Sequence, residues 1–528
     1  MNQRAPQVSG YSEAGASLER RALRGFVPNS GSPAEDIDRN LSTLRQRSRM
    51  LVMSTPVATA AITTNRTKVI GTGLTLKAAV DRERLGLTPE AAKEWERRAE
   101  AEFRLWCRRE NCDALGLNSF AGLQQLALYS QLSSGDCFVL LRHDAPTPMT
   151  PYGLRLQLVE ADRVSTPSRY CGGLADGLSG GAIPEGEPGA GHKIYDGVEV
   201  DAAGRVVAYH VADAYPRAFL VDKAVTWTRV LAWGERSGLP NVLHLMAAER
   251  PDQYRGVPYL APVIEPLLQM RRYTESELMA ALVQSYFTAW ITTDTNGSEI
   301  PINEVGAGDI DGAGSGEGDE GISHHENEYE LGSGTVLHLR PGESVSFANP
   351  NIPTSGYEPF IKTNTRLVGS ALELPYDVIA KEFNSSYSAS RGALLEAWEG
   401  FKMRRAWFVE DFCQPVYELW LAEAVARGRI KAPGFFDDPA LRAAWCGARW
   451  IGPVQGQLDP KKEVEANILM VQYGFKTREQ VTREMGGGDW GENAEQLRQE
   501  NEQLPAPAGT GAFPEDGDDD KEEEGEDT

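Results

Sequence analysis

The sequence predicts an α+β protein in which a mixed region of helices and strands is followed by long helices and a helical C-terminal region. Runs of apolar and β-branched residues such as DCFVLLRH (136–143) predict strands in the first half. From residue 262 onward, apolar residues recur at helical spacing, with one long Gly-rich interruption. A chain of 528 residues has room for about three or four domain-sized units.

The N-terminal part is read as a flexible arm followed by helices. Residues 1–35 are rich in Gly, Ser, Pro and Arg and show no periodicity, so no packed structure is expected there. Thr88 and Pro89 form an N-cap and first-turn pair that opens a helix carrying Trp95, Phe103 and Trp106. The other helices predicted here span 36–53, 57–70, where Gly71 and Gly73 close the second, and about 120–132.

Strand patterns follow these helices. The Gly- and Pro-rich residues 171–191 between them are expected to form an exposed loop. A turn at Asp201–Gly204 joins the last two strand runs. The predicted strands span 136–143, 154–162, 194–200 and 205–213.

The second half is predicted to consist mainly of long helices. Residues 262–290 form one helix of roughly 40 Å at 1.5 Å per residue. A second helix, 357–372, has Glu358, Lys362 and Arg366 at i, i+4 spacing on one face. Its opposite face is apolar and is formed by Tyr357, Phe360, Ile361, Val368, Ala371 and Leu372.

A third long helical region begins after residues 386–390 and continues to Trp420, with a kink expected at Pro415. A final short helix, 461–473, and the segment 478–485 come next. The chain then continues as a polar tail whose composition is unsuited to a packed core.

Charge is concentrated in two segments of the chain. Residues 303–330 carry nine acidic residues and no Lys or Arg, and residues 505–528 carry ten acidic residues and one Lys. Each segment contributes −9, so −5 of the formal net charge of −23 remains for the other 476 residues. This balance excludes the strongly basic character typical of a sequence-reading DNA-binding module. It fits both a protein that lets DNA slide and a neutral enzyme.

Local motifs give no support for catalysis. His324, His325, Glu326 and His338 lie in or beside the Gly-rich acidic insertion, without the helix-held spacing of a metal site, so neither metal nor cofactor is expected. No nucleophile elbow and no phosphate-binding GK[ST] motif is present. The six cysteines lack metal spacing and are expected to be reduced and mostly buried.

No stretch has the roughly 18 to 20 apolar residues of a membrane span, and the N-terminus MNQRAPQVSG lacks the order of a secretory signal. Synthesis in a cytoplasm and no membrane partner are therefore expected.

Eight strings in a fixed order resemble the lambda-type portal proteins of tailed bacteriophages. The similarity runs from about residue 36 to about residue 485. One string alone is weakly specific, but eight in this order and spacing are strongly so. They are VIGTG (69–73), SSGDCFVLL (133–141), LQLVEADRV (156–164), GVEVDAAGRVVAYHV (197–211), RGVPYLAPVIEPL (255–267), LRPGESVSFANP (339–350), YEPFIKTNTRLVGSALELPYDVIAKEFNSSYSASR (357–391) and RWIGPVQGQLDPKKEVEAN (449–467).

The resemblance implies a dodecameric ring at one capsid vertex. Double-stranded DNA is packaged through its channel by terminase and later ejected, and the ring joins head to tail. The implied partners are the terminase large subunit, head-tail adaptor proteins and the major capsid or scaffold protein. The implied divisions are an arm (1–35), an α+β wing (36–258), a first stem helix (259–290), a clip (291–350), a second stem helix (351–380), a tunnel loop (381–391), a helical wing or crown (392–485) and a disordered acidic tail (486–528).

The resemblance also implies site residues. If the second stem helix faces the channel, Lys362 and Arg366 form basic rings. Short polar side chains of the tunnel loop then lie at the narrowest point: Asn384, Ser385, Ser386 and Ser388. The clip candidates are Trp290, Leu337 and His338, with strands at 289–293 and 335–340. The Gly-rich stretch 305–321 departs from the compact clip that the family pattern leads us to expect.

Two alternatives remain open from the residues. One is a cytoplasmic hydrolase whose acidic loop borders the active site. The other is a different head-tail connector, although such chains are usually much smaller. The hydrolase requires a fixed nucleophile, acid/base pair or metal set, and the predicted helices and strands contain none.

Overall fold

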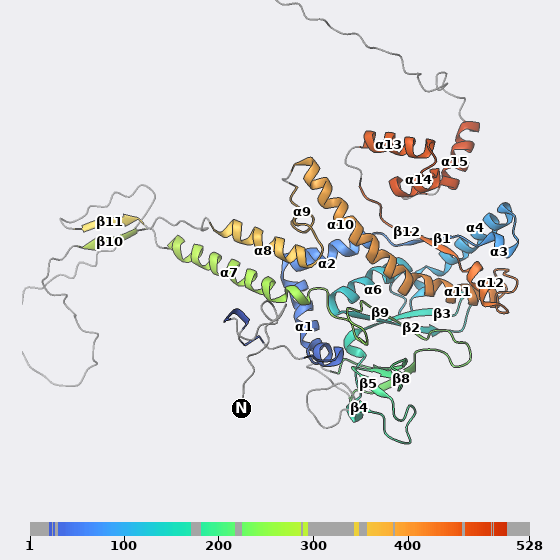
Figure 1. Ribbon diagram of the computed structural model, residues 1–528, viewed down its shortest axis with the longest axis horizontal. Coiled ribbons are helices and arrows are strands. Elements are labelled where there is room, and N and C mark those ends of the chain that lie inside the picture. Colours follow the sequence, from blue (N-terminus) through green and yellow to red (C-terminus); the bar gives the residue numbers. More distant parts are fainter. Residues whose placement is uncertain are drawn as a thin grey trace, which may run out of the picture. The chain divides into compact units, whose positions relative to one another are not determined.

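Figure 1 shows the fold as a computed structural model. It describes residues 21–503, apart from residues 24, 27–29, 171–180, 217–223, 287–288, 294–342, 348–355, 384–385, 457–459, 487 and 489. The chain divides into two compact units, of which Met1–Leu267 with Thr365–Thr528 is the first and Leu268–Asn364 the second.

Two N-terminal helices confirm those predicted over 36–53 and 57–70. They are α1 (Arg39–Ser54) and α2 (Pro56–Val69). The backbone of Thr55 between them is extended, because a proline disfavours helical geometry in the residue before it. A 3-10 turn (Arg21–Leu23) and a π-helical turn (Ala34–Asp38) precede α1.

Helix α4 (Pro89–Trp106) begins where the sequence predicts. The hydroxyl of Thr88 accepts a hydrogen bond of 3.3 Å from the N–H of Ala91, which satisfies one free donor of the first turn. Phe103 of α4 packs edge-on against Phe120 and Trp420, with ring centroids 5.6 and 5.0 Å apart, respectively. Neighbouring helices are α3 (Arg82–Leu85), α5 (Arg109–Cys112) and α6 (Phe120–Ser134).

Two sheets form the strand-rich part of the first unit. A three-stranded antiparallel sheet has the order β3-β2-β9, and helix α6 packs against it (Figure 1). A five-stranded meander has the order β4-β5-β6-β7-β8. Phe138, Val159, Val198 and Tyr209 belong to one hydrophobic cluster that joins them. Their bounds are β2 (Asp136–His143), β3 (Leu154–Glu160), β4 (Gly181–Ala182), β5 (Lys193–Tyr195), β6 (Val198–Val200), β7 (Val206–Ala212), β8 (Trp227–Leu231) and β9 (Val242–Met246).

The predicted strands are confirmed with two adjustments. The run predicted over 154–162 ends at Glu160, and a 3-10 turn (Ala161–Arg163) follows. The run predicted over 194–200 is two short strands, because the chain reverses at Asp196 and Gly197, which both have positive φ. A further two-stranded sheet pairs β1 (Thr75–Ala78) with β12 (Ala448–Ile451).

The long helices of the second half are present with shifted ends. Helix α7 (Ile264–Tyr286) stops before residue 290, because the aromatic and β-branched run that follows forms strand β10 (Ala289–Thr293) instead. Helix α8 (Tyr357–Ala371) and the short helix α9 (Tyr376–Ala380) come later. Helix α10 (Tyr387–Phe408) starts earlier than predicted, since Ser386 caps it.

The expected irregularity near Pro415 is a π-helical turn, Val409–Cys413, between α10 and α11 (Gln414–Ala426). Pro415 lies in the first turn of α11, where its missing N–H is tolerated. One expectation is wrong: the segment expected to be disordered from residue 486 begins with helix α15 (Trp490–Gln503). The remaining helices are α12 (Pro439–Trp445), α13 (Pro460–Gln472) and α14 (Arg478–Gly486).

Candidate functional site

Helix α8 carries the two cations predicted to face a channel, Lys362 and Arg366. They lie one turn apart, about 6 Å along the helix axis. Arg366 is exposed and Lys362 is half-buried. The guanidinium carbon of Arg366 lies 5.5 Å from the ring centroid of Tyr376, close enough for a cation–π contact that orients the side chain.

The apolar face predicted for α8 is only partly covered. Val368 and Leu372 are each 1% exposed, so the C-terminal part of this face is buried. The other members of the predicted face are half-buried or exposed, namely Tyr357, Ile361, Phe360 and Ala371. Leu367, which was not assigned to that face, is 63% exposed. A single chain therefore leaves apolar surface of this helix in contact with solvent.

The turn after α8 fixes where the helix ends. The N–H of Leu374 donates a 2.8 Å hydrogen bond to the carbonyl of Gly369. A Cβ on Gly369 would lie 2.3 Å from the carbonyl oxygen of Leu374, so only glycine allows this close approach. Pro375 then leads directly into α9.

The predicted tunnel loop is shorter than 381–391. The hydroxyl of Ser386 accepts a 3.4 Å hydrogen bond from the N–H of Ala389, which makes Ser386 the N-cap of α10. Ser388 lies in the first turn of that helix and not in a loop. Asn384 and Ser385 lie outside the described residues. Tyr376 helps to hold the segment before them through a 2.7 Å hydrogen bond from its hydroxyl to the carboxylate of Glu382.

The predicted clip is described only in part. Strand β10, expected at 289–293, is confirmed, and it pairs in antiparallel register with β11 (Glu343–Phe347), so that Trp290 lies opposite Ser346. Leu337, His338 and the strand predicted over 335–340 lie outside the described residues. So does the Gly-rich stretch 305–321.

Helices α7 and α8 are joined by aromatic contacts within the second unit. The ring of Tyr273 stacks on that of Tyr357 at 5.7 Å and packs against Phe360 at 4.6 Å. Another stretch of α7 remains uncovered, since Leu278, Met279 and Leu282 are 60%, 60% and 52% exposed. Side chains of this kind are usually buried in a packed core or in an interface between chains.

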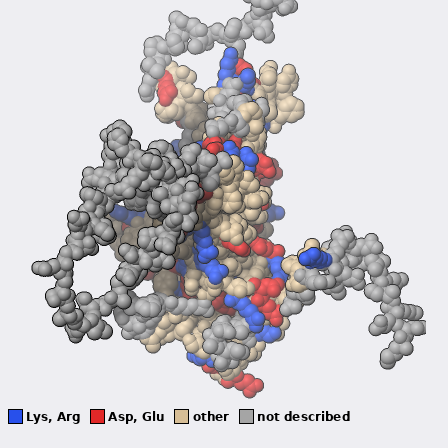
Figure 2. All heavy atoms as spheres, turned by 90° about the vertical axis from the view of Figure 1, so that its left-hand side faces the viewer, with Lys and Arg blue, Asp and Glu red and all other residues tan. Residues whose placement is uncertain are grey.

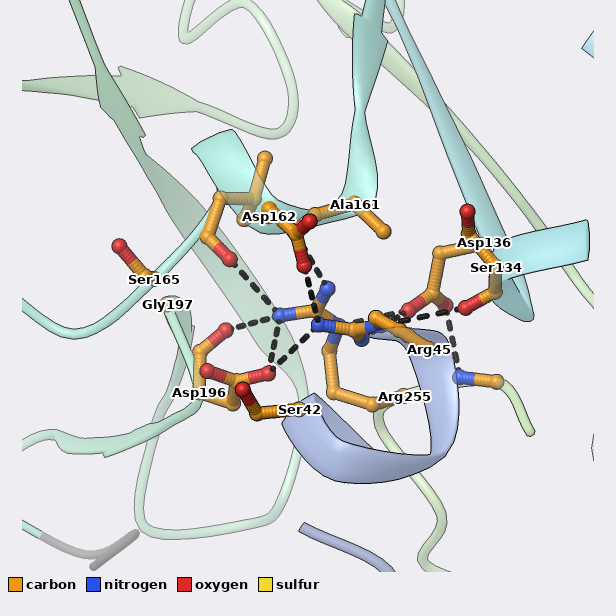
Figure 3. Close-up of polar contacts among 12 residues, drawn as sticks. Ser42, Arg45, Ser134, Asp136, Ala161, Asp162, Ser165, Asp196, Gly197 and Arg255 are labelled. Carbon is orange, nitrogen blue, oxygen red and sulfur yellow. Dashed lines mark hydrogen bonds and ion pairs between the residues drawn. The ribbon is translucent and has the colours of Figure 1, made fainter. Parts of the chain in front are cut away.

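A buried ionic cluster, which sequence patterns do not reveal, ties α1 to both sheets (Figure 3). The carboxylate of Asp136, at the start of β2, accepts hydrogen bonds from Arg45 (2.7 Å) and Arg255 (2.9 Å). His244 donates another, at 2.9 Å. The N–H of Gly256 donates a fourth, at 2.6 Å. Burial alone would raise the pKa of Asp136, but the charge of Arg255, the hydrogen bond from His244 and the charge of Arg45 hold it well below its ordinary value.

Arg255 satisfies its other donors within the same cluster. It bonds to the carbonyls of Ala161 and Val164, each at 2.9 Å, and pairs with Asp196 at 2.8 Å. Arg255 lies nine residues before the start of α7. The role of the cluster is structural: each buried charge has partners, which is what makes its burial tolerable.

A second buried carboxylate is satisfied in the same way. Glu199 of β6 forms a bidentate pair with Arg229, with both distances 2.7 Å, and hydrogen bonds with His192 and His210. Burial would raise the pKa of Glu199, but these hydrogen bonds lower it to about 2.

The described residues offer little for metal binding or thiol chemistry. No group of three or more His, Cys, Asp or Glu residues able to hold a metal occurs among them. The five described cysteines are free, and four are buried, as the sequence predicts. Burial raises the pKa of the Cys137 thiol to about 12, so it is protonated at neutral pH. Among the described residues, no helix is long and apolar enough to cross a membrane.

Acidic and basic side chains are interspersed on the surface. On the face shown in Figure 2, neither Lys and Arg nor Asp and Glu form one dominant area among the described residues. This agrees with the near-balance of charge outside the two acidic segments.

Comparison with known proteins gives a consistent picture. The model of the family described as "Phage portal protein, lambda family" matches residues 19–405. The portal protein of Escherichia phage N15 is 23% identical over 509 residues, which cover 95% of this chain and 91% of that protein. Portal protein B of Escherichia phage lambda is 23% identical over 516 residues, with the same two coverages.

Two of the solved structures similar to this chain are of gene transfer agent (GTA) particles. The neck of the native particle, computed with C12 symmetry, gives a TM-score of 0.38 at 12% identity, covering 85% of this chain and 94% of that one. A chain of the native GTA virion gives a TM-score of 0.39 at 13% identity, covering 84% and 92%.

Proposed function

Because this chain belongs to the lambda family of phage portal proteins, and is thus a portal protein through which a virion packages and ejects its DNA, we propose that twelve copies form a ring at one capsid vertex. α7 and α8 form its stem, and the channel passes along α8. The family is structural and not catalytic, so the hydrolase alternative is set aside.

The main observation that supports ring assembly is the solvent-exposed apolar surface of α7. Leu278, Met279 and Leu282 are each more than half exposed in the single chain. At about 25 cal/mol per Å² of apolar surface buried, covering such side chains stabilises association. A closed ring covers the same surface on every copy and leaves no free edge.

Channel lining by α8 is supported by its charges. Lys362 and Arg366, one turn apart, would give two cationic rings of twelve. Single exposed contacts of this kind contribute about 0 to 1 kcal/mol, weak enough to let DNA pass, and the ring multiplies them. The segment around Ser386, together with Asn384, Ser385 and Ser388, lines the narrowest point.

The sheet of β10 and β11 forms the clip, with Trp290, Leu337 and His338 as contact candidates. The terminase large subunit and head-tail adaptors bind at this end. The wing faces the major capsid or scaffold protein.

The test replaces Lys362 and Arg366 with Gln in virions. We expect rings at normal yield but shorter packaged DNA or poorer retention. The matched control is Lys193→Gln with Arg236→Gln, two exposed cations of the first unit, which should package as the unmodified protein does. Full-length, retained DNA in the α8 variant would exclude α8 from the channel.

A further inference from the structure

Helix α4 has carboxylates on its inward face and cations on its outward face. Its inward carboxylates are engaged: Glu96 accepts a 3.0 Å hydrogen bond from the N–H of Val80, and Glu100 accepts one of 3.1 Å from that of Ala78. Glu102 forms a bidentate pair with Arg429, at 2.8 and 2.9 Å. The hydrogen bonds and the ion pair hold these carboxylates on the inward face, where Lys93 and Arg104 act on Glu96 and Glu100 through space without a direct ion pair.

The outward face carries a cationic stripe formed by Lys93, Arg97, Arg104 and Arg108. At 100° per residue, the first three lie within about 40° of one another over roughly 16 Å, and Arg108 follows the end of the helix. All four are exposed, and none forms an ion pair or a side-chain hydrogen bond with any other described residue.

Within α4 and the two residues after it, exposed cations outnumber exposed carboxylates. The other exposed charged residues of α4 are Glu90 and Glu94 near its start and Arg98, whose guanidinium donates a 3.0 Å hydrogen bond to the carbonyl of Arg429. Exposed charges from Glu90 to Arg108 therefore comprise five cations and two carboxylates. Unpaired cations gathered on one face are suited to an anionic partner.

The same chain supplies such a partner close by. Helix α15 ends at Gln503, and 25 residues follow it. Arg97 contributes, after hydrogen bonds from Arg498 and Gln499, to a lowered pKa of Glu495 in α15, so this helix lies within electrostatic range of the stripe. At about 3.3 Å per residue the following segment has ample reach. Residues 505–528 hold ten carboxylates and one Lys.

We propose that the acidic C-terminal segment, residues 505–528, binds the cationic stripe of α4 in its own subunit. Tethering places the segment at an effective concentration in the millimolar range, which suits contacts that are individually weak. The bound segment shields the stripe from other polyanions, and DNA is the polyanion that a portal protein meets. This inference concerns the outer surface of the first unit and does not depend on which residues line the channel.

The test uses the full-length chain with the ten carboxylates of 515–527 replaced by Asn or Gln, which frees the stripe. The probe is a fluorescent peptide of residues 505–528, and its binding is followed by anisotropy at 50 and 300 mM salt. We expect binding at low salt that weakens at least tenfold at high salt. Adding K93Q, R97Q, R104Q and R108Q should weaken low-salt binding at least tenfold.

The matched control replaces four exposed cations elsewhere, R39Q, K193Q, R205Q and R236Q, with the same change of charge. It should bind the peptide within about twofold of the starting variant. Equal loss in both quadruple variants would show non-specific attraction and overturn the proposal. The proposal would also be overturned if the variant with the freed stripe bound a 20-base-pair duplex but not the peptide. The stripe would then be a nucleic-acid site.

Discussion

Replacing Asp136 with Asn should strongly destabilise the first unit. The side chain of Asp136 is fully buried and accepts hydrogen bonds from Arg45, Arg255 and His244. Asn keeps the shape but removes the charge, which leaves two buried guanidinium groups facing each other with only partly exposed aspartates as partners. Breaking a buried pair in this way costs about 3 to 5 kcal/mol. That is a large part of the roughly 5 to 15 kcal/mol that stabilises a typical domain.

Urea unfolding followed by tryptophan fluorescence measures this loss. With a slope of about 1 to 3 kcal/mol per molar urea, the midpoint should fall by at least about 1 M. Asp144→Asn is the matched control: its side chain is 63% exposed and forms one ion pair with Arg155 at 3.5 Å. It should lose about 1 kcal/mol or less. Equal shifts for the two variants would refute the view that the buried cluster holds α1 on the sheets.

Two further changes test local features. Burial, with repulsion from Asp196, raises the pKa of Asp38 from 3.8 to about 7. Ionisation of Asp38 therefore lowers the stability of the fold: the loss begins as the pH rises above about 4 and is complete above about 7. Asp38→Asn should therefore raise the melting temperature at pH 8, by an amount equivalent to about 4 kcal/mol at about 1.4 kcal/mol per pKa unit, and change it little at pH 4. The same change at both pH values would contradict this. Gly369→Ala should lower the free energy of unfolding by about 1 to 3 kcal/mol, because the added Cβ meets the carbonyl of Leu374. Gly392→Ala is the control: its Cβ would have nothing within 4 Å, so thermal melts should show a neutral or slightly stabilising change.

Elements with local signals could be predicted from the sequence. Thr88 and Pro89 fix the start of α4 through a cap and a proline that act within one turn. The strands at 136–143 and 205–213 follow from continuous apolar and β-branched runs. The resemblance, carried by eight strings, predicted the family that the comparisons show.

Features that depend on distant residues could not be predicted. Arg45, Asp136 and Arg255 meet although 91 and 119 residues separate Asp136 from its two partners. No local pattern marks a charged residue as buried, because burial is decided by how α1 and the sheets pack. The start of α10 differs from the prediction for another reason: residues 386–390 include three serines, and the N-cap hydrogen bond of Ser386 places the other four of these residues inside the helix. Helix α15 was missed because it has few apolar residues.

The mass of the purified protein tests the central claim most directly. Twelve copies of the 57.8 kDa chain give about 690 kDa. Mass photometry at physiological salt should show a species near this mass, and negative-stain images of the same sample should show rings with a central hole. Replacing Leu278 and Leu282 with Gln should shift the population toward smaller species, since both side chains are exposed in the single chain. A stable monomer near 58 kDa at every concentration of the unmodified protein would contradict the account.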